Sequence, residues 1–273
     1  MRVGDLHLHT NVSDGRLSPT DVVKKVVAAG LGFFSITDHN SIAGQHEAKE
    51  AVPAGGPRCI YGVELSAQPN GAEELHVLGY GFDPADDGLL AMCRQLTQRK
   101  KDQLRAIVME LRLQGVDVYE SELAFGDDDN YVGRPVLAEL LVRKGVVRSM
   151  NQAFVRHLRP DTQTYVPMVL TPVKDVIEAI QAAGGLAVLA HPTIDTVDRW
   201  LAPLAELGLD GIETYRPALS GNEQLYVEKA AEHFGIFVTG GSDSHARGDD
   251  DQPGSFTVSE ALLAGFFEAL GGR

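Results

Sequence analysis

The 273-residue sequence has few cysteines, no excess of basic residues and no long hydrophobic run, and each absence excludes a class of protein. Its two cysteines, Cys59 and Cys93, have no metal-site spacing, so we expect a reduced compartment and no disulfide support. A formal net charge of −14 argues against non-specific nucleic-acid binding over the whole surface. No apolar run could span a bilayer, and the N-terminus leads directly into a strand pattern. We therefore expect no signal peptide, no membrane association and a cytoplasmic location.

Short apolar segments rich in Val, Ile, Leu and Phe are predicted to be buried strands. The seven segments are 3–9, 33–37, 59–65, 75–80, 186–190, 211–215 and 237–241. Ser18-Pro19 and Thr171-Pro172 are typical of helix starts, and Gly30 and Gly184 of helix ends. Alternation of strands and helices predicts parallel βα units, and seven strands favour an α/β distorted (β/α)7 barrel over an open sheet. Active sites of barrels lie at the carboxyl ends of their strands.

A helical stretch interrupts this alternation, so we predict a barrel from residues 1–84 and 168–273 with an inserted helical cap at 85–167. From 85 to 170 there are twelve Lys or Arg and twelve Asp or Glu residues, whereas the remainder carries the whole net charge of −14. Basic residues are thus enriched in the cap, where an anionic substrate would need them. For Arg99, Lys100 and Lys101 the alternative is a solvated helix surface.

Metal-binding side chains gather where the predicted strands end. Asp5, His7 and His9 alternate along the first strand and so share one face, and Asp243 and His245 repeat that spacing after the last strand. With His7, His9, Asp243 and His245, the candidate ligands are Asp14, His39, Glu64, His76 and His191, whereas Asp5 is expected to support the ligands from behind. Nitrogen and carboxylate ligands assembled in this way suit a cluster of divalent metals, and such clusters commonly hydrolyse phosphate esters.

Any one of these histidines could instead be a hydrogen-bonded structural residue. We interpret His46, His157 and His233 in that way because they lie in helical patterns. The set at the strand ends argues otherwise, since buried polar groups are costly unless they are paired or metal-bound. Asp38 is either a ligand or a residue that orients a histidine.

Several segments together resemble the motifs of the PHP (polymerase and histidinol phosphatase) superfamily. They are Asp5-Leu6-His7-Leu8-His9, Thr37-Asp38-His39, Gly62-Val63-Glu64, His191-Pro192 and Ser242-Asp243-Ser244-His245. The resemblance covers nearly the whole chain. Through the stretches 130–135 and 165–167, the chain is most similar to bacterial phosphoesterases that act on nucleoside 3′,5′-bisphosphates and short RNA 5′ ends.

The resemblance implies a distorted (β/α)7 barrel that holds three metals. The implied ligands are His7, His9, Glu64 and Asp243 for the first, Glu64, His76 and His191 for the second, and Asp14, His39 and His245 for the third. Relatives carry histidine at the position of Asp14, and the carboxylate should favour Mn²⁺ or Fe²⁺ over Zn²⁺. Arg216 also stands where relatives often have histidine, and Thr164 replaces a small or basic residue. We expect two to three ions, Mn²⁺ foremost.

The expected reaction is in-line attack on phosphorus by a hydroxide shared between metals, without a covalent enzyme intermediate. The sequence does not identify the acid that protonates the leaving oxygen. Arg134 precedes Pro135 at the start of a predicted helix at 135–144, where an anion would be favoured, so we expect it to hold a second phosphate. Arg216 either reaches phosphate or forms a surface salt bridge.

Three functional hypotheses follow. The first is a metal-dependent phosphatase that removes the 3′-phosphate of nucleoside 3′,5′-bisphosphates such as adenosine 3′,5′-bisphosphate, with 5′-to-3′ trimming of short RNA as a related activity. The second is a histidinol-phosphate or other small-molecule phosphatase. The third is a non-catalytic metal-binding module, as in polymerase-attached relatives. All nine expected ligand positions are filled, which favours an enzyme, and we expect no attached polymerase. We expect a nucleotide or short RNA as the binding partner and no obligate protein partner.

Overall fold

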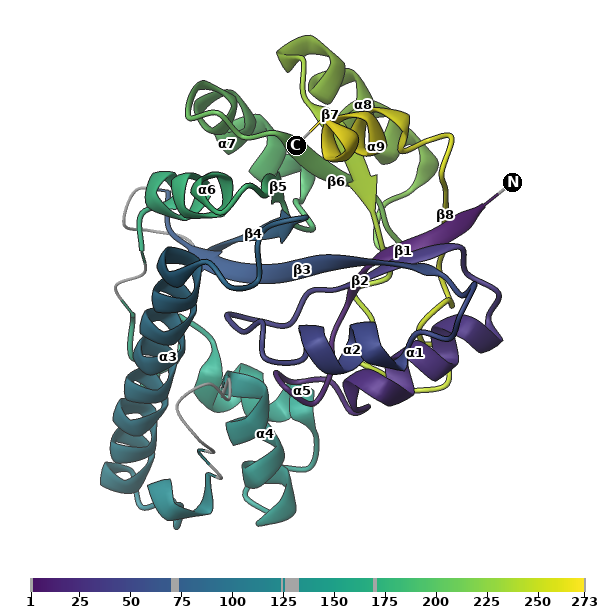
Figure 1. Cartoon of the computed structure of the whole chain (residues 1–273). Coiled ribbons are helices and arrows are strands. Elements are labelled where there is room, and N and C mark those ends of the chain that lie inside the picture. The colour runs from purple at the N-terminus through teal and green to yellow at the C-terminus, as the bar shows by residue number, and fades with distance from the viewer. Residues whose placement is uncertain (1, 70–73, 124, 126–132, 169–170, 273) are drawn as a thin grey trace.

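A strongly curved sheet of eight strands, in the order β7-β6-β5-β4-β3-β2-β1-β8, forms a nearly closed barrel (Figure 1). The computed structural model describes residues 2–69, 74–123, 125, 133–168 and 171–272. The strands are β1 Val3–Leu8, β2 Phe33–Ile36, β3 Arg58–Ala67, β4 Leu75–Tyr80, β5 Leu186–Leu189, β6 Gly211–Tyr215, β7 Phe237–Gly240 and β8 Val258–Ser259. A parallel bridge between Leu8 and Ser244 brings the segment after β7 against β1. The predicted α/β barrel class is therefore confirmed.

The prediction of parallel βα units does not hold for β4, which pairs antiparallel with both β3 and β5. Only residues 68–74 separate β3 from β4. A parallel connection needs a crossover of about a dozen residues or more, so this length permits only a hairpin. The short strand β8, antiparallel to β1, was not predicted, because two residues carry no detectable periodicity.

Helices cover the outside of the barrel (Figure 1). They are α1 Pro19–Ala28, α2 Gln45–Ala51, α6 Val173–Ala182, α7 Ile194–Glu206, α8 Gly221–Phe234 and α9 Ala264–Gly271. Ser18 caps α1 as expected, accepting a hydrogen bond from the Asp21 backbone N–H, and Gly30 follows the helix with a φ of +70°. Thr171 does not cap α6, because the N-cap residue is Pro172 and the Thr171 hydroxyl accepts a hydrogen bond from Arg99.

A second group of helices lies beside the barrel and has its own hydrophobic core. It comprises α3 Asp87–Leu113, η1 Glu120–Glu122, α4 Arg134–Arg143, α5 Met150–Ala153 and η2 Phe154–Leu158. The long helix α3 joins the two bodies (Figure 1): Leu89 and Leu96 belong to the barrel core, whereas Leu104 and Ile107 belong to the core of the other helices. The division at 85–167 stays a prediction. The two cores indicate that α3 passes from the barrel core to the core of the other helices along its length.

The junction between the two cores is built from polar residues of α3. Thr97 and Gln103 are buried there, and Lys100 and Lys101 are only 4% and 3% exposed. The Gln103 side chain donates a hydrogen bond to the Val166 carbonyl at 2.8 Å. The structure therefore excludes the solvated alternative for the two lysines.

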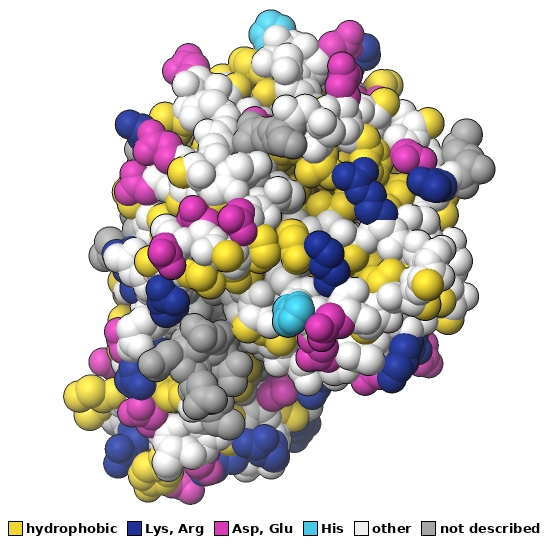
Figure 2. Space-filling model, in the orientation of Figure 1, with side chains coloured by type: hydrophobic (Ala, Val, Ile, Leu, Met, Phe, Trp, Pro, Cys, Tyr) yellow, Lys and Arg dark blue, Asp and Glu magenta, His cyan; other side chains and the backbone are white. Residues whose placement is uncertain are grey.

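The surface carries acidic and basic side chains interspersed with one another on the face shown in Figure 2. Among the helices that the structure describes, none combines the length and the apolar character needed to span a bilayer.

Gly62 allows β3 to approach β2 closely, two residues before Glu64. A Cβ at Gly62 would lie 2.1 Å from Ser35 Oγ and 2.7 Å from the Ile36 carbonyl oxygen. We therefore expect Gly62→Ala to lower the free energy of unfolding by about 1–3 kcal/mol. Urea denaturation would measure this loss. Gly221→Ala is the matched control, because its Cβ meets no atom within 4 Å and its stability should not fall. A Gly62→Ala protein as stable as the control would contradict the close-approach argument.

Candidate metal centre

The nine predicted metal ligands come from separate segments of the chain and meet at one rim of the barrel. His7 lies on β1, Glu64 on β3 and His76 at the start of β4. Because β4 runs antiparallel, its first residues reach the rim at which the parallel strands end. His39 and His191 lie in the loops after β2 and β5. The remaining ligands, His9, Asp14, Asp243 and His245, lie in the loops that follow β1 and β7.

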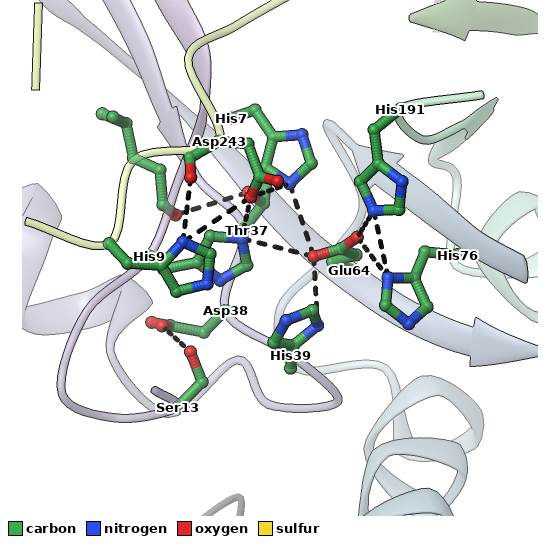
Figure 3. A network of polar contacts seen from close by, with 12 residues as sticks. His7, His9, Ser13, Thr37, Asp38, His39, Glu64, His76, His191 and Asp243 are labelled. Atoms are coloured by element: carbon green, nitrogen blue, oxygen red, sulfur yellow. Dashed lines mark hydrogen bonds and ion pairs between the residues drawn. The ribbon is translucent and has the colours of Figure 1, made fainter. Parts of the chain in front are cut away.

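The carboxylate of Glu64 lies at the centre of this rim, fully buried, and its Oε1 faces two histidines (Figure 3). Oε1 is 2.8 Å from His76 Nδ1 and 2.8 Å from His191 Nε2. The two imidazole nitrogens are themselves 3.1 Å apart. These three residues are the set that the family resemblance assigned to the second metal.

The other oxygen of Glu64 faces the first strand. Oε2 is 3.3 Å from both His7 Nε2 and His9 Nε2, and 3.0 Å from His39 Nδ1. Asp243 Oδ1 lies 3.4 Å from His7 Nε2 and 3.1 Å from His9 Nε2. The set expected for the first metal is thus gathered around Glu64 Oε2, so this one carboxylate could bridge two ions.

Asp14 gathers the third set. Its Oδ1 is 3.1 Å from His245 Nε2 and 3.8 Å from His39 Nε2. His9 also turns its Nδ1 toward Asp14 Oδ1, at 3.9 Å. Arg247 donates to Asp14 Oδ2 at 2.9 Å, which leaves Oδ1 directed at the histidines. Among the described residues, three groups have ligand atoms within 4.8 Å of one another: His9, Asp14, His39 and His245; His7, His9 and Asp243; and His39, Glu64 and His76.

Two buried atoms indicate that these donors fit metal ions better than they fit one another. His9 Nδ1 and Asp14 Oδ1 are both buried, and neither makes a hydrogen bond of acceptable geometry within the part of the chain that the structure describes. Buried polar atoms without partners are costly, and native proteins pair almost all of them. A divalent ion bound by imidazole nitrogen and carboxylate oxygen would satisfy both atoms.

Buried carboxylates fix the loops that carry the ligands. Asp5 accepts hydrogen bonds from the backbone N–H and hydroxyl of Ser242, directly before Asp243. Asp38 accepts from Ser13 Oγ at 2.5 Å and from the Thr10 N–H and hydroxyl, so it holds the loop that presents Asp14. The structure therefore gives Asp38 a loop-positioning role instead of a contact that orients a histidine.

Sequence reasoning missed Glu213, which lies on β6 and is 1% exposed. Its Oε1 is 2.9 Å from His7 Nδ1, and its Oε2 accepts a hydrogen bond from the His191 backbone N–H at 2.7 Å. It thereby orients one candidate ligand and holds the loop of another, in the manner of carboxylates behind metal-bound histidines. The available signal was an acidic residue inside an otherwise buried strand pattern.

Glu74 was missed as well. Its carboxylate contacts Lys100, lies 3.4 Å from His76 Nε2 and lies 3.5 Å from an Arg134 guanidinium nitrogen. Burial favours its neutral form, but Lys100 and His76 outweigh burial and hold the pKa of Glu74 well below its usual range.

Arg134 is the first residue of α4, and its guanidinium also lies 5.8 Å from the Tyr165 ring. Arg216 donates to the Pro192 carbonyl at 2.6 Å, next to His191, and pairs with no carboxylate among the residues that the structure describes. Thr164 is 1% exposed and donates to the His157 carbonyl, which makes it structural. The motif residues 130–132 lie outside the described residues.

The carboxylates set the protonation of the metal-free histidines. Burial alone would lower the pKa of His9, but Asp243 and Glu64 outweigh burial and raise it to about 10. Glu64 and Glu74 likewise raise the pKa of His76 to about 9 against the effect of burial. His39 behaves oppositely, because burial, together with the charges of His9 and His76, lowers its pKa to about 3.

The barrel thus carries, at its rim, groups of histidine and carboxylate donors that could bind divalent metals of the kind used by hydrolytic enzymes. The PHP domain family model matches residues 5–133. A 3′,5′-nucleoside bisphosphate phosphatase from Chromobacterium violaceum is 29% identical over 251 residues, which are 90% of this chain and 88% of that protein. A 5′-3′ exoribonuclease from Haemophilus influenzae is 31% identical over 247 residues, 88% of this chain and 89% of that protein.

The fold agrees with these similarities. The crystal structure of a putative metal-dependent phosphoesterase from Bifidobacterium adolescentis superposes with a TM-score of 0.84 at 26% identity, over 98% of each chain. The chain belongs to the PHP family and is a metal-dependent phosphoesterase.

Metal binding should release protons from this centre. Because the raised pKa values leave His9 and His76 protonated at neutral pH in the metal-free protein, an ion must displace those protons. Calorimetric titration of Mn²⁺ at pH 7 in two buffers of different ionisation enthalpy should show release of about one to two protons per loaded molecule. The apparent affinity should rise from pH 7 toward pH 9. The control is His46→Gln, which replaces an exposed histidine. Identical heats of Mn²⁺ binding in the two buffers would contradict the prediction.

Proposed function

We propose that this PHP-family phosphoesterase removes the 3′-phosphate of nucleoside 3′,5′-bisphosphates and leaves the nucleoside 5′-monophosphate. The observation that carries the proposal is a pair of cations beside the metal centre. Lys100 and Arg134 converge on Glu74, whose carboxylate is 3.4 Å from the candidate ligand His76. One phosphate at the metal centre and a second at the cations would use both features. The name of the Chromobacterium violaceum relative supports this substrate class.

The proposed ligands are those named above for three sites, and they would hold two to three ions, of which Mn²⁺ suits the carboxylate-containing donor sets best. When bound by these residues, divalent ions would neutralise the phosphate oxygens and would make a water-derived nucleophile available near neutral pH. The chain itself binds and orients the substrate. Lys100 and Arg134 would fix the distal phosphate and so hold the scissile ester at the metal centre.

The side chains around the centre favour hydrolysis without a covalent enzyme intermediate. Ser13 and Ser242 donate their hydroxyl protons to buried carboxylates, at 2.5 Å to Asp38 and 2.6 Å to Asp5. Both carboxylates also accept hydrogen bonds from backbone N–H groups, Asp38 from Thr10 and Asp5 from Ser242, so each serine contact belongs to a set of bonds that holds a loop. Cys59 and Cys93 belong to hydrophobic packing on the barrel, and burial raises the pKa of the Cys59 thiol to about 11.

A second candidate activity is 5′-to-3′ trimming of short RNA. The name of the Haemophilus influenzae relative favours it, and the same cation pair offers a place for the next backbone phosphate. The two candidates differ in whether the group beyond the second phosphate must be small.

The decisive assay measures phosphate release from adenosine 3′,5′-bisphosphate in Mn²⁺ and again with chelator. AMP and a short 5′-phosphorylated RNA run in parallel separate the candidates. Rapid, metal-dependent release from the bisphosphate with little from AMP is the expected result. Absence of release from every nucleotide by the metal-loaded protein would overturn the proposal and point to small non-nucleotide phosphate esters.

Arg134→Ala should impair the bisphosphate selectively. Losing a guanidinium that pairs with a phosphate should raise KM for adenosine 3′,5′-bisphosphate by about tenfold or more, whereas hydrolysis of a simple monophosphate should change little. Steady-state kinetics on both substrates would measure this difference. Arg143→Ala removes an exposed arginine from the other end of α4 and is the matched control. Equal effects of Arg134→Ala on the two substrates would refute a role at the second phosphate.

Asp14 should set the metal preference of the third group. Replacing its carboxylate by imidazole in Asp14→His softens the donor set, so we expect the bound Zn²⁺ to Mn²⁺ ratio to rise by about tenfold. Metal analysis after dialysis against an equimolar mixture would show the change. Asp249→His adds a histidine to the exposed loop nearby and controls for adventitious binding. An unchanged ratio in Asp14→His would remove Asp14 from the ligand set.

A further inference from the structure

We propose that Glu74 is the counter-ion that a substrate phosphate displaces from Lys100 and Arg134, and that the same carboxylate orients His76. Phosphate binding at the cap and metal binding at the rim would then be coupled through one side chain. This inference rests on the proposed function in placing the second phosphate at those two cations.

Three elements converge on Glu74. Its Oε1 contacts Lys100 Nζ of α3 and lies 3.4 Å from His76 Nε2 of β4. Its Oε2 lies 3.5 Å from an Arg134 guanidinium nitrogen of α4. The side chains of Lys100, Glu74 and Arg134 are 6%, 23% and 25% exposed, so the group is shielded yet reachable. A pocket whose lining includes Glu74, His76, His191 and Thr196 adjoins it.

The orientation of His76 assigns a role to each of its nitrogens. Nδ1 faces Glu64 Oε1 at 2.8 Å and His191 Nε2 at 3.1 Å, so Nδ1 is the atom available to a metal. Nε2 is left to carry a proton toward Glu74. A carboxylate behind a metal-bound histidine fixes the ring and raises its basicity, and losing it typically weakens metal binding about 10- to 100-fold.

The charges explain why phosphate would displace Glu74 from the cations. One carboxylate carries a single negative charge, whereas a phosphate monoester near neutral pH carries close to two and offers three acceptor oxygens to Lys100 and Arg134. Arg134 is held loosely, since its other contacts within the described residues are a 3.4 Å hydrogen bond to the Leu158 carbonyl and the Tyr165 ring, 5.8 Å from its guanidinium. Once Lys100 and Arg134 pair with phosphate, Glu74 can accept a hydrogen bond from His76 without competition from them. Because coupling between two sites is reciprocal, metal binding at His76 would favour phosphate binding in turn.

Glu74→Gln separates this role from a purely structural one. The substitution keeps the shape of the side chain but removes its charge, so the cations lose a competitor while His76 loses a strong acceptor. Phosphate should therefore bind more tightly and Mn²⁺ more weakly. A merely structural residue would weaken both when replaced.

The experiment titrates inorganic phosphate into the metal-free protein with chelator present, and separately measures Mn²⁺ binding by equilibrium dialysis. In Glu74→Gln the Kd for phosphate should fall by about fivefold, and the Kd of the weakest Mn²⁺ site should rise by about tenfold. The gain in phosphate affinity should vanish in Arg134→Ala/Glu74→Gln. Glu122→Gln is the matched control, because Glu122 pairs with Lys144 at 2.7 Å within the cap, and it should change neither Kd.

Weaker binding of both ligands, or no change in either, would overturn the role of Glu74. Failure of the proposed function gives a different pattern. If wild-type protein binds phosphate no better than Arg134→Ala, both the second-phosphate site and this inference fall. If the wild type shows that dependence and Glu74→Gln alters neither Kd, only this inference falls.

Discussion

The rim of this barrel depends on one buried carboxylate, Glu64. Five histidine nitrogens lie within 3.3 Å of its two oxygens, which is more positive charge than one carboxylate could balance if every ring were protonated. In the metal-free protein the pKa of His9 is therefore raised against the effect of burial, while burial and the charges of His9 and His76 lower that of His39, because the rings compete for the same carboxylate. Divalent ions would resolve it, because neutral imidazoles and an ionised carboxylate are the forms that bind metal. The centre is therefore arranged for ions and not for internal pairing.

The fold places Glu64 where such a cluster can form. The hairpin of β3 and β4 returns His76 to the same rim, and Gly62 allows β3 to lie close against β2. Behind the ligands, Asp5, Asp38 and Glu213 hold three separate loops through hydrogen bonds to backbone N–H groups. Each of these carboxylates is buried and hydrogen-bonded, which is the condition for tolerating its charge in the interior.

The sequence was informative about the parts of the centre that depend on local periodicity. Alternation of Asp5, His7 and His9, and the position of His191 after an apolar run, follow from strand geometry and barrel topology. The direction of β4 was also within reach, because the short connection from β3 excludes a parallel crossover. The roles of Glu213 and Glu74 were not, since the partners of each come from strands and helices distant in sequence, such as His7 for Glu213 and Lys100 for Glu74. Burial of Lys100 likewise depends on how α3 packs between two cores.

Charge balance explains how an acidic chain could attract an anionic substrate. The overall formal charge is −14, so long-range attraction of phosphate by the whole molecule is not available. The attraction must be local. Asp14, Glu64 and Asp243 are the three carboxylates among the proposed ligands, and two or three divalent ions would give that group a net positive charge while the histidines stay neutral. Lys100 and Arg134 add a second positive site whose strength Glu74 moderates in the resting protein. In the proposed function, a ligand with two phosphates would engage both sites at once, whereas a monophosphate would engage only one. This difference would supply selectivity without a basic surface.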